Sequence, residues 1–247
     1  MSEYIVFPNA PITEALLDIR AVLPQDVDLK KLLTFHDSIK EIFPEKQERV
    51  SFEAGFQISS EGTTVLPTSK NPDGYFFRSS IENKIVQVRL DGFTFNKLKP
   101  YGKWQVFRDE AHELWKLYCQ TANPVKITRL GLRYINRIEI PLPISDFKEY
   151  LLTTPEIAPK LPQALEHFFI QLVIPNPDIP AKTIITQTMQ PPVNNQILPL
   201  ILDIDVFHEA EYPVDKFEIW DVFEKLCIFK NEIFFSSITD KTKELFK

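Results

Sequence analysis

Three arginines recur at intervals of four residues in the middle of the chain: Arg129, Arg133 and Arg137. The side chains of a β-strand alternate between its two faces, so these three positions share one face if the stretch is a strand. Guanidinium groups gathered on one face pair bidentately with phosphate and carboxylate groups. The spacing therefore suits a surface that binds an anionic ligand.

More charged side chains are expected on the same non-core face of the neighbouring strands. The candidate binding residues, for a ligand or a partner, are Arg20, Arg89, Arg129, Arg133, Arg137, Asp91, Asp203 and Asp205, and Glu14, Asp18, Glu53, Gln57, Gln171 and Gln187 extend this set. If the sheet curves, these groups converge, and convergent carboxylates would suit a divalent metal. The alternative is a solvated face with cross-strand ion pairs, each worth about 0.2–1 kcal/mol.

Motifs for catalysis are absent from the sequence. The four histidines, His36, His112, His167 and His208, form no helical i, i+4 pair and no HExxH motif. No GxSxG nucleophile motif is present. Cys119 lies seven residues from His112 on one expected helix, and no third member of a triad is evident. Known motifs therefore identify no catalytic residue, metal ligand or cofactor.

The composition is that of an ordinary globular domain. The chain has 247 residues, with 44% hydrophobic and 25% charged residues and a net charge of −6, so one compact domain over 1–247 is expected. Nucleic-acid binding is not expected, because it needs clustered lysine and arginine. The absence of a long apolar run or a secretory N-terminus and of any CxxC pattern predicts a cytoplasmic protein with no membrane segment.

The first half alternates between strand and helix patterns. Residues 12–23 alternate as a strand with Leu17 and Ile19 on the buried face, and Asp28 is placed to cap a helix that stops at Pro44. The further elements expected in this half are strands over 50–58, 75–79 and 86–90, a turn at the NPDG of residues 71–74, a bulge at Gly92 and a helix over 104–118.

The second half repeats this order. The expected elements are a long strand over 128–140, a short helix capped by Ser145, strands over 167–174, 182–189 and 198–207, a long helix over 214–235 and a last helical turn. In the long strand Leu132 and Tyr134 should be buried, with Arg133 on the opposite face and Gly131 able to host a bulge or a close neighbour.

The two halves also align in sequence. When Pro24 is set on Pro141, Arg20 falls on Arg137 and the apolar positions are in phase, and VRLD ending at Asp91 matches LILD ending at Asp203. We therefore expect an α+β fold of two β-α-β-β-β-α units, one over 10–122 and one over 126–238. Their strands would form one curved antiparallel sheet with helices on one face.

This order of elements resembles the helix-grip topology of the TATA-box-binding protein, which is itself an internal duplication. The resemblance lies in the order of the elements and not in residues. The saddle of that protein is apolar and basic, whereas the matching face here would carry mixed charge, which argues against DNA binding.

Two segments resemble the signatures of a sporadically distributed, uncharacterised family of prokaryotic proteins of about this length. They are NAPITEALLDIR near the start and RLGLRYINRIEIP in the middle. The family has no established activity, so the resemblance implies a prokaryotic cytoplasmic setting and no catalytic residue.

Two functions of different classes follow from these observations. The first is a non-enzymatic binding protein that engages a protein partner encoded nearby, in a defence or toxin–antitoxin setting, with charge complementarity to a basic partner. The second is a domain that binds a nucleotide or another small anion, with metal-dependent phosphohydrolase activity as an extension of it. The arginine-bearing strand face is the candidate site in both cases.

Overall fold

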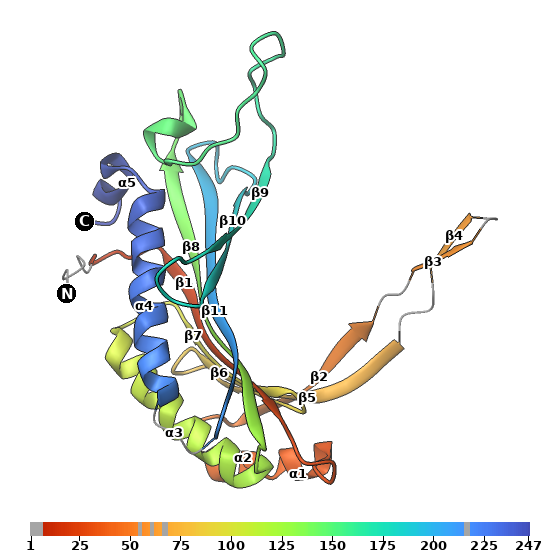
Figure 1. The fold of residues 1–247 in the computed structure, drawn as a ribbon. Coiled ribbons are helices and arrows are strands. Elements are labelled where there is room, and N and C mark those ends of the chain that lie inside the picture. The colour runs from red at the N-terminus through yellow and green to blue at the C-terminus, as the bar shows by residue number, and fades with distance from the viewer. Residues whose placement is uncertain (1–6, 54–55, 60–61, 66–68, 215–217) are drawn as a thin grey trace.

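The protein is an α+β structure built on one large antiparallel sheet (Figure 1). The computed structural model describes residues 7–53, 56–59, 62–65, 69–214 and 218–247. The strands are β1 (Ile12–Val22), β2 (Glu45–Glu53), β3 (Phe56–Ser59), β4 (Gly62–Val65), β5 (Ser69–Ser79), β6 (Lys84–Arg89), β7 (Gly92–Leu98), β8 (Lys126–Pro141), β9 (Phe169–Pro175), β10 (Lys182–Met189) and β11 (Ile197–Tyr212). The helices are α1 (Leu29–Leu33), α2 (Phe35–Ile39), α3 (Trp104–Ala122), the 3-10 turn η1 (Phe147–Glu149), α4 (Glu218–Ser237) and α5 (Asp240–Glu244).

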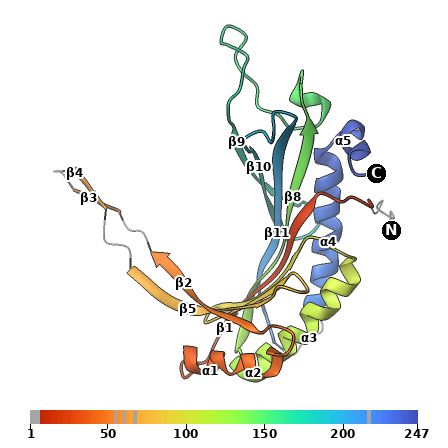
Figure 2. The same cartoon turned by 180° about the vertical axis from the view of Figure 1, so that it is seen from behind.

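Nine strands form the main sheet in the order β2-β5-β6-β7-β1-β8-β11-β10-β9, and every pairing is antiparallel. The sheet bends strongly from the upright β8 and β11 to the β2–β5 pair, and α3 and α4 lie on the outer side of the bend (Figures 1 and 2). None of the described helices lies on the inner, concave face. Strands β3 and β4 form a separate two-stranded sheet at the end of the arm that continues from β2 and β5.

Alternation of apolar residues decides which face is buried. Leu17 and Ile19 of β1 and Leu132 of β8 are fully buried, and Tyr134 is 1% exposed. They face the helices, whose apolar sides supply Phe107, Trp115, Phe223 and Leu226 to the same core. Arg133, between Leu132 and Tyr134, is exposed on the other face as expected. The two strands at the centre thus place their charged residues on the concave face.

Several boundaries differ from the sequence expectations. Residues 71–74, read as a turn, lie inside β5, where the register with β2 shifts between Arg49 and Val50 and makes Asp73 the extra residue of a bulge. Asp146, and not Ser145, caps η1 by accepting a hydrogen bond from the Lys148 amide. The strand expected over 50–58 is divided between β2 and β3, and residues 54–55 within it lie outside the described part of the chain.

The largest omission from the sequence expectations is strand β7. Gly92 does not interrupt β6 with a bulge but begins this new strand, which inserts between β6 and β1. Its φ of +147° is a conformation that favours glycine, and an added Cβ would lie 2.1 Å from the Ile19 carbonyl oxygen. Gly92 therefore lets the chain turn tightly after β6 and return as β7, which pairs with β1.

Candidate functional site

Asp18 on β1 is the centre of the polar network on the concave face. Its Oδ1 accepts hydrogen bonds from Arg89 Nη2 at 2.8 Å and from Thr94 Oγ1 at 2.7 Å. Its Oδ2 accepts from Arg129 Nη1 at 3.1 Å and from Arg20 Nε at 3.3 Å. One carboxylate thus joins side chains from four strands, β1, β6, β7 and β8.

Around Asp18 the concave face encloses a polar hollow of about 330 Å³. Its lining residues are Leu16, Asp18, Arg20, Arg49, Gln87, Arg89, Thr94, Arg129, Gly131, Arg133 and Asp205. Five of these are arginines and two are aspartates. We call this space the arginine hollow.

Curvature of the sheet brings the lining together. Arg49 is on β2 and Arg133 on β8, and four strands lie between β2 and β8 in the sheet. In a flat sheet five steps of 4.7–4.9 Å would separate those two strands by about 24 Å. The bend seen in Figure 2 sets β2 and β5 at an angle to β8 and β11. Long side chains from β2 and β8 therefore line one space.

Further aspartates bind the arginines of the lining from outside the hollow. Asp91, in the turn after β6, pairs with Arg20 and with Arg89, the latter at 2.8 Å. Asp73 pairs with Arg49. Asp203 on β11 accepts from Arg133 Nε at 2.9 Å. The arginines are therefore held in place by carboxylates on one side while the hollow opens on the other.

Gly131 explains how Arg129 reaches the centre of the hollow. A Cβ on Gly131 would lie 2.6 Å from Arg129 Nη1, so the missing side chain leaves the space in which the guanidinium lies. The guanidinium carbon is 4.5 Å from the centre of the Phe207 ring, in cation–π range. Arg129 then bridges Asp18 and Asp205, with Nη2 3.2 Å from Asp205 Oδ2. The register of β8 with its neighbours does not shift at Gly131, so no bulge forms there.

The two aspartates of the lining differ in electrostatic environment. Burial by itself would raise the pKa of Asp18, but the charges of Arg89 and Arg20 and the Thr94 hydrogen bond lower it below its ordinary value. Burial raises the pKa of Asp205, and Arg129 and Arg133 do not reverse this effect. Asp18 is therefore strongly held as an anion, whereas Asp205 is the less compensated carboxylate.

Arg89 is the most deeply buried cation of the network. Its side chain is 3% exposed. Burial lowers the pKa of Arg89, but the charges of Asp18 and Asp91 raise it above the ordinary value. A buried guanidinium with two carboxylates and the Thr94 hydroxyl around it is a fixed part of the structure. The more exposed Arg133 and Arg20, at 45% and 40%, are better placed to meet a ligand.

The structure separates the sequence candidates into three groups. Arg20, Arg89, Arg129, Arg133 and Asp205 line the hollow. Asp91 and Asp203 bind these arginines from outside it. Arg137 shares the face but lies beyond the lining, with Nε 3.6 Å from Glu139 Oε1.

The three glutamines and two glutamates expected on this face have different positions. Gln187 is on the wrong face: it pairs with Leu202, is 1% exposed and lies on the helix side of the sheet. Gln171 is on the expected face, where it donates to Thr186 Oγ1 at 3.3 Å. Glu14 accepts from Asn96 Nδ2 at 2.6 Å. The side chains of Glu53 and Gln57 lie outside the described residues.

Arg49 was missed from the sequence, because the strand expected there began only at Val50. The bulge at this point lies in β5, where Asp73 is the extra residue, and β2 continues through it without an added residue. The only available signal was the charged segment EKQER itself, which reads equally well as a loop.

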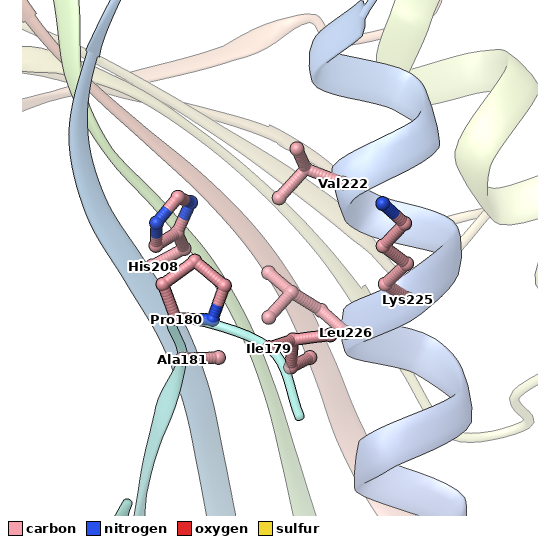
Figure 3. A pocket seen from close by; sticks show the side chains of 7 residues that line it. All are labelled: Ile179, Pro180, Ala181, His208, Val222, Lys225 and Leu226. Atoms are coloured by element: carbon pink, nitrogen blue, oxygen red, sulfur yellow. The ribbon is translucent and has the colours of Figure 1, made fainter. Parts of the chain in front are cut away.

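A second pocket lies on the helix side of the sheet and has a different character (Figure 3). It measures about 110 Å³, and its lining is Ile179, Pro180, Ala181, His208, Val222, Lys225 and Leu226. Burial lowers the pKa of His208, whose Nδ1 contacts the Tyr212 hydroxyl. The small apolar volume accommodates little more than a side chain, so the arginine hollow is the stronger candidate site.

The carboxylates of the hollow do not assemble as metal ligands. Within the described ranges, no group of three or more His, Cys, Asp or Glu side chains is placed to hold a metal ion.

The described helices include none that is long and apolar enough to cross a bilayer. No known family model and no curated protein matches this sequence. The site must therefore be interpreted from its own geometry.

Proposed function

We propose that this protein binds an anionic ligand whose phosphate or carboxylate groups enter the arginine hollow. The observation that carries the proposal is the convergence of five arginines from four strands on one open space of about 330 Å³. Guanidinium groups fixed by carboxylates behind them present their remaining N–H donors without reorganisation, which favours bidentate contact with an anion. Binding without chemistry is the simplest reading, because the carboxylates are engaged with arginines.

Arg133 provides the test. The probes are inorganic phosphate, pyrophosphate, ATP and citrate, and the measurements are calorimetric titration and melting temperature. Arg133→Ala should weaken binding of the best probe by roughly tenfold or more, equivalent to about 1.4 kcal/mol. It should cost little stability, because the Arg133 side chain is 45% exposed.

Arg137→Ala is the matched control, since Arg137 lies on the same strand and face, four residues away and outside the lining. It should change the affinity by less than about twofold. The proposal fails if no probe binds the wild-type protein, or if both variants lose binding equally. A destabilised Arg133→Ala that binds normally would mean that the network is a structural ion-pair lattice.

A protein partner is the second candidate, and the arm that carries β3 and β4 beyond β2 and β5 favours it. The arm extends well away from the body of the molecule, a placement typical of a segment that contacts another chain (Figure 1). A partner encoded nearby would be recovered stoichiometrically from native lysate. Repeated recovery of none would count against this candidate.

We also propose that the sheet is an internal duplication with the helix-grip arrangement. The order of strands supports this: outward from β1 lie β7, β6 and β5, and outward from β8 lie β11, β10 and β9. One expected equivalence has to change. Asp91 lies in a turn and Asp203 within β11, so Thr94 of β7 takes the place that matches Asp203. Superposition of residues 10–122 on 126–238 in an experimental structure tests the duplication.

A further inference from the structure

The two edges of the nine-stranded sheet differ sharply in chemistry. One edge is β2, which begins Glu45, Lys46, Gln47, Glu48 and Arg49, the first four of them exposed. Charged side chains on an edge strand disfavour pairing with another chain. The charges of β2 therefore protect this edge against pairing with a strand of another chain.

The other edge, β9, has no such protection. Its sequence is FIQLVIP, with no charged residue between Phe169 and Pro175. Phe169 is 61% exposed, Val173 63%, Ile174 42% and Leu172 36%. Helix α4 contacts β8 and β11, and β9 lies two positions outward from β11 in the sheet, away from α4 (Figure 1). An exposed apolar edge strand is a ready site for pairing with a further strand.

We propose that β9 pairs antiparallel with β9 of a second copy of this chain. An uncharged strand is complementary to itself, because no like charges are brought opposite one another in residues 169–175 in any register. A two-fold axis perpendicular to the sheet joins the same edge of both copies, so the contact is isologous. The charged β2 edge cannot repeat the contact, and the assembly closes at two copies.

This pairing preserves the two faces of the sheet. Leu172 and Ile174 pair with the buried Ile185 and Thr183 of β10, so they lie on the helix side. Phe169 and Val173 lie on the concave side. In the dimer the exposed β9 side chains of one copy lie against those of the other copy. Both arginine hollows then open on the same side of one continuous sheet. The paired strands span about 24 Å, an interface at the small end of the stable range, so dissociation in the micromolar range is expected.

Sedimentation equilibrium of the full-length chain between about 1 and 200 μM tests the proposal. The wild-type protein should pass from monomer to dimer, and Val173→Lys should raise the dissociation constant at least tenfold by placing a charge on each edge. Val106→Lys is the matched control: Val106 is 64% exposed on α3, and its replacement should leave the dimer intact. Circular dichroism and the melting temperature establish that both variants are folded.

Single cysteines at positions 171, 172 and 173 provide a second measurement in a Cys119→Ser, Cys227→Ser background. Directly opposed Cβ atoms of an antiparallel pair lie about 4.5–5.5 Å apart, so the position nearest the two-fold axis should form a reducible cross-linked dimer. A wild-type monomer at every concentration overturns the proposal. A dimer that Val173→Lys leaves intact, or the absence of cross-linking at all three positions, also overturns it, because the contact would then lie elsewhere.

Discussion

At the scale of single residues, Asp18 and Asp205 show that two carboxylates in one hollow have opposite roles. Both bind Arg129, but Asp18 also accepts from Arg89, Arg20 and Thr94. The surplus of donors lowers the pKa of Asp18, whereas burial raises that of Asp205. The charged form of Asp18 therefore stabilises the folded protein, whereas keeping Asp205 charged lowers its stability.

Replacement of each aspartate by the isosteric asparagine should therefore change the stability of the protein by different amounts. Asp18→Asn should destabilise the protein by about 2 kcal/mol, because Arg89 and Arg129 lose charge-assisted hydrogen bonds in a site with little solvent. Asp205→Asn should lie within about 1 kcal/mol of the wild type, because burial disfavours the charged form of Asp205 and offsets part of what its ion pair with Arg129 contributes. Urea denaturation at pH 7 measures both. Equal losses would contradict the division of roles.

Acid stability follows from the same pKa shifts. The pKa of Asp18 is lowered in the folded state, so its contribution is present above the unfolded value of about 3.9 and is lost as the pH falls below it. The raised pKa of Asp205 acts in the opposite sense, with stability lost as the pH rises through the interval above that value. The urea midpoint of wild type should therefore decrease more steeply below pH 4 than that of Asp18→Asn. Parallel curves would show that Asp18 does not dominate the acid transition.

At the scale of elements, the sheet depends on a tight turn between β6 and β7. Gly92 adopts a φ of +147° beside the Ile19 carbonyl, and this turn allows β7 to insert next to β1. Strand β7 supplies Thr94 to the hollow and the buried Phe93 and Phe95 to the core. A backbone requirement at one glycine thus joins the hydrophobic core to the polar site.

Gly92→Ala should cost more than about 2 kcal/mol, because a side chain is strained at this φ and its Cβ would overlap the Ile19 oxygen. Gly102→Ala is the control, since nothing lies within 4 Å of its Cβ position. That change should be neutral or stabilise by about 0.4–1 kcal/mol through the unfolded state. Thermal and urea unfolding measure the stability of both variants. A Gly92→Ala protein as stable as the wild type would disprove the close approach of Gly92 to the Ile19 carbonyl.

At the scale of the whole molecule, curvature turns a mixed-charge sheet face into an open hollow. The helices cover the outer side of the bend, and the inner side remains open to a ligand (Figure 2). The arm beyond β2 and β5 is outside this arrangement, because β3 and β4 pair in a sheet of their own. Body and arm should therefore be separable.

Shortening the arm tests this separation. Glu53 and Ser69 are opposite one another at the ends of β2 and β5, so residues 54–68 can be replaced by an Asn-Gly hairpin turn. The melting temperature should stay within about 2 °C, which is less than about 1 kcal/mol for a domain of this size. Anion affinity should be unchanged, while loss of a captured protein would assign partner binding to the arm. A markedly less stable variant would show instead that the arm supports the body.

Elements whose residues alternate regularly could be predicted without the structure. The central strands β1 and β8, helix α3 and the antiparallel α+β class were predictable, because the apolar period of two or 3.6 residues records which side is buried. The same period placed Arg129 and Arg133 on one polar face.

The tertiary fold was needed to show which of those charged residues meet. Arg49 lines the site because the bend of the sheet brings the inner face of β2 toward that of β8. Gln187 does not, because its register with β11 turns that side chain toward the helices. Register and curvature arise from contacts between distant segments, and local sequence carries little information about them. The residue types on each strand were therefore written in the sequence, and their convergence into one hollow was decided by the fold.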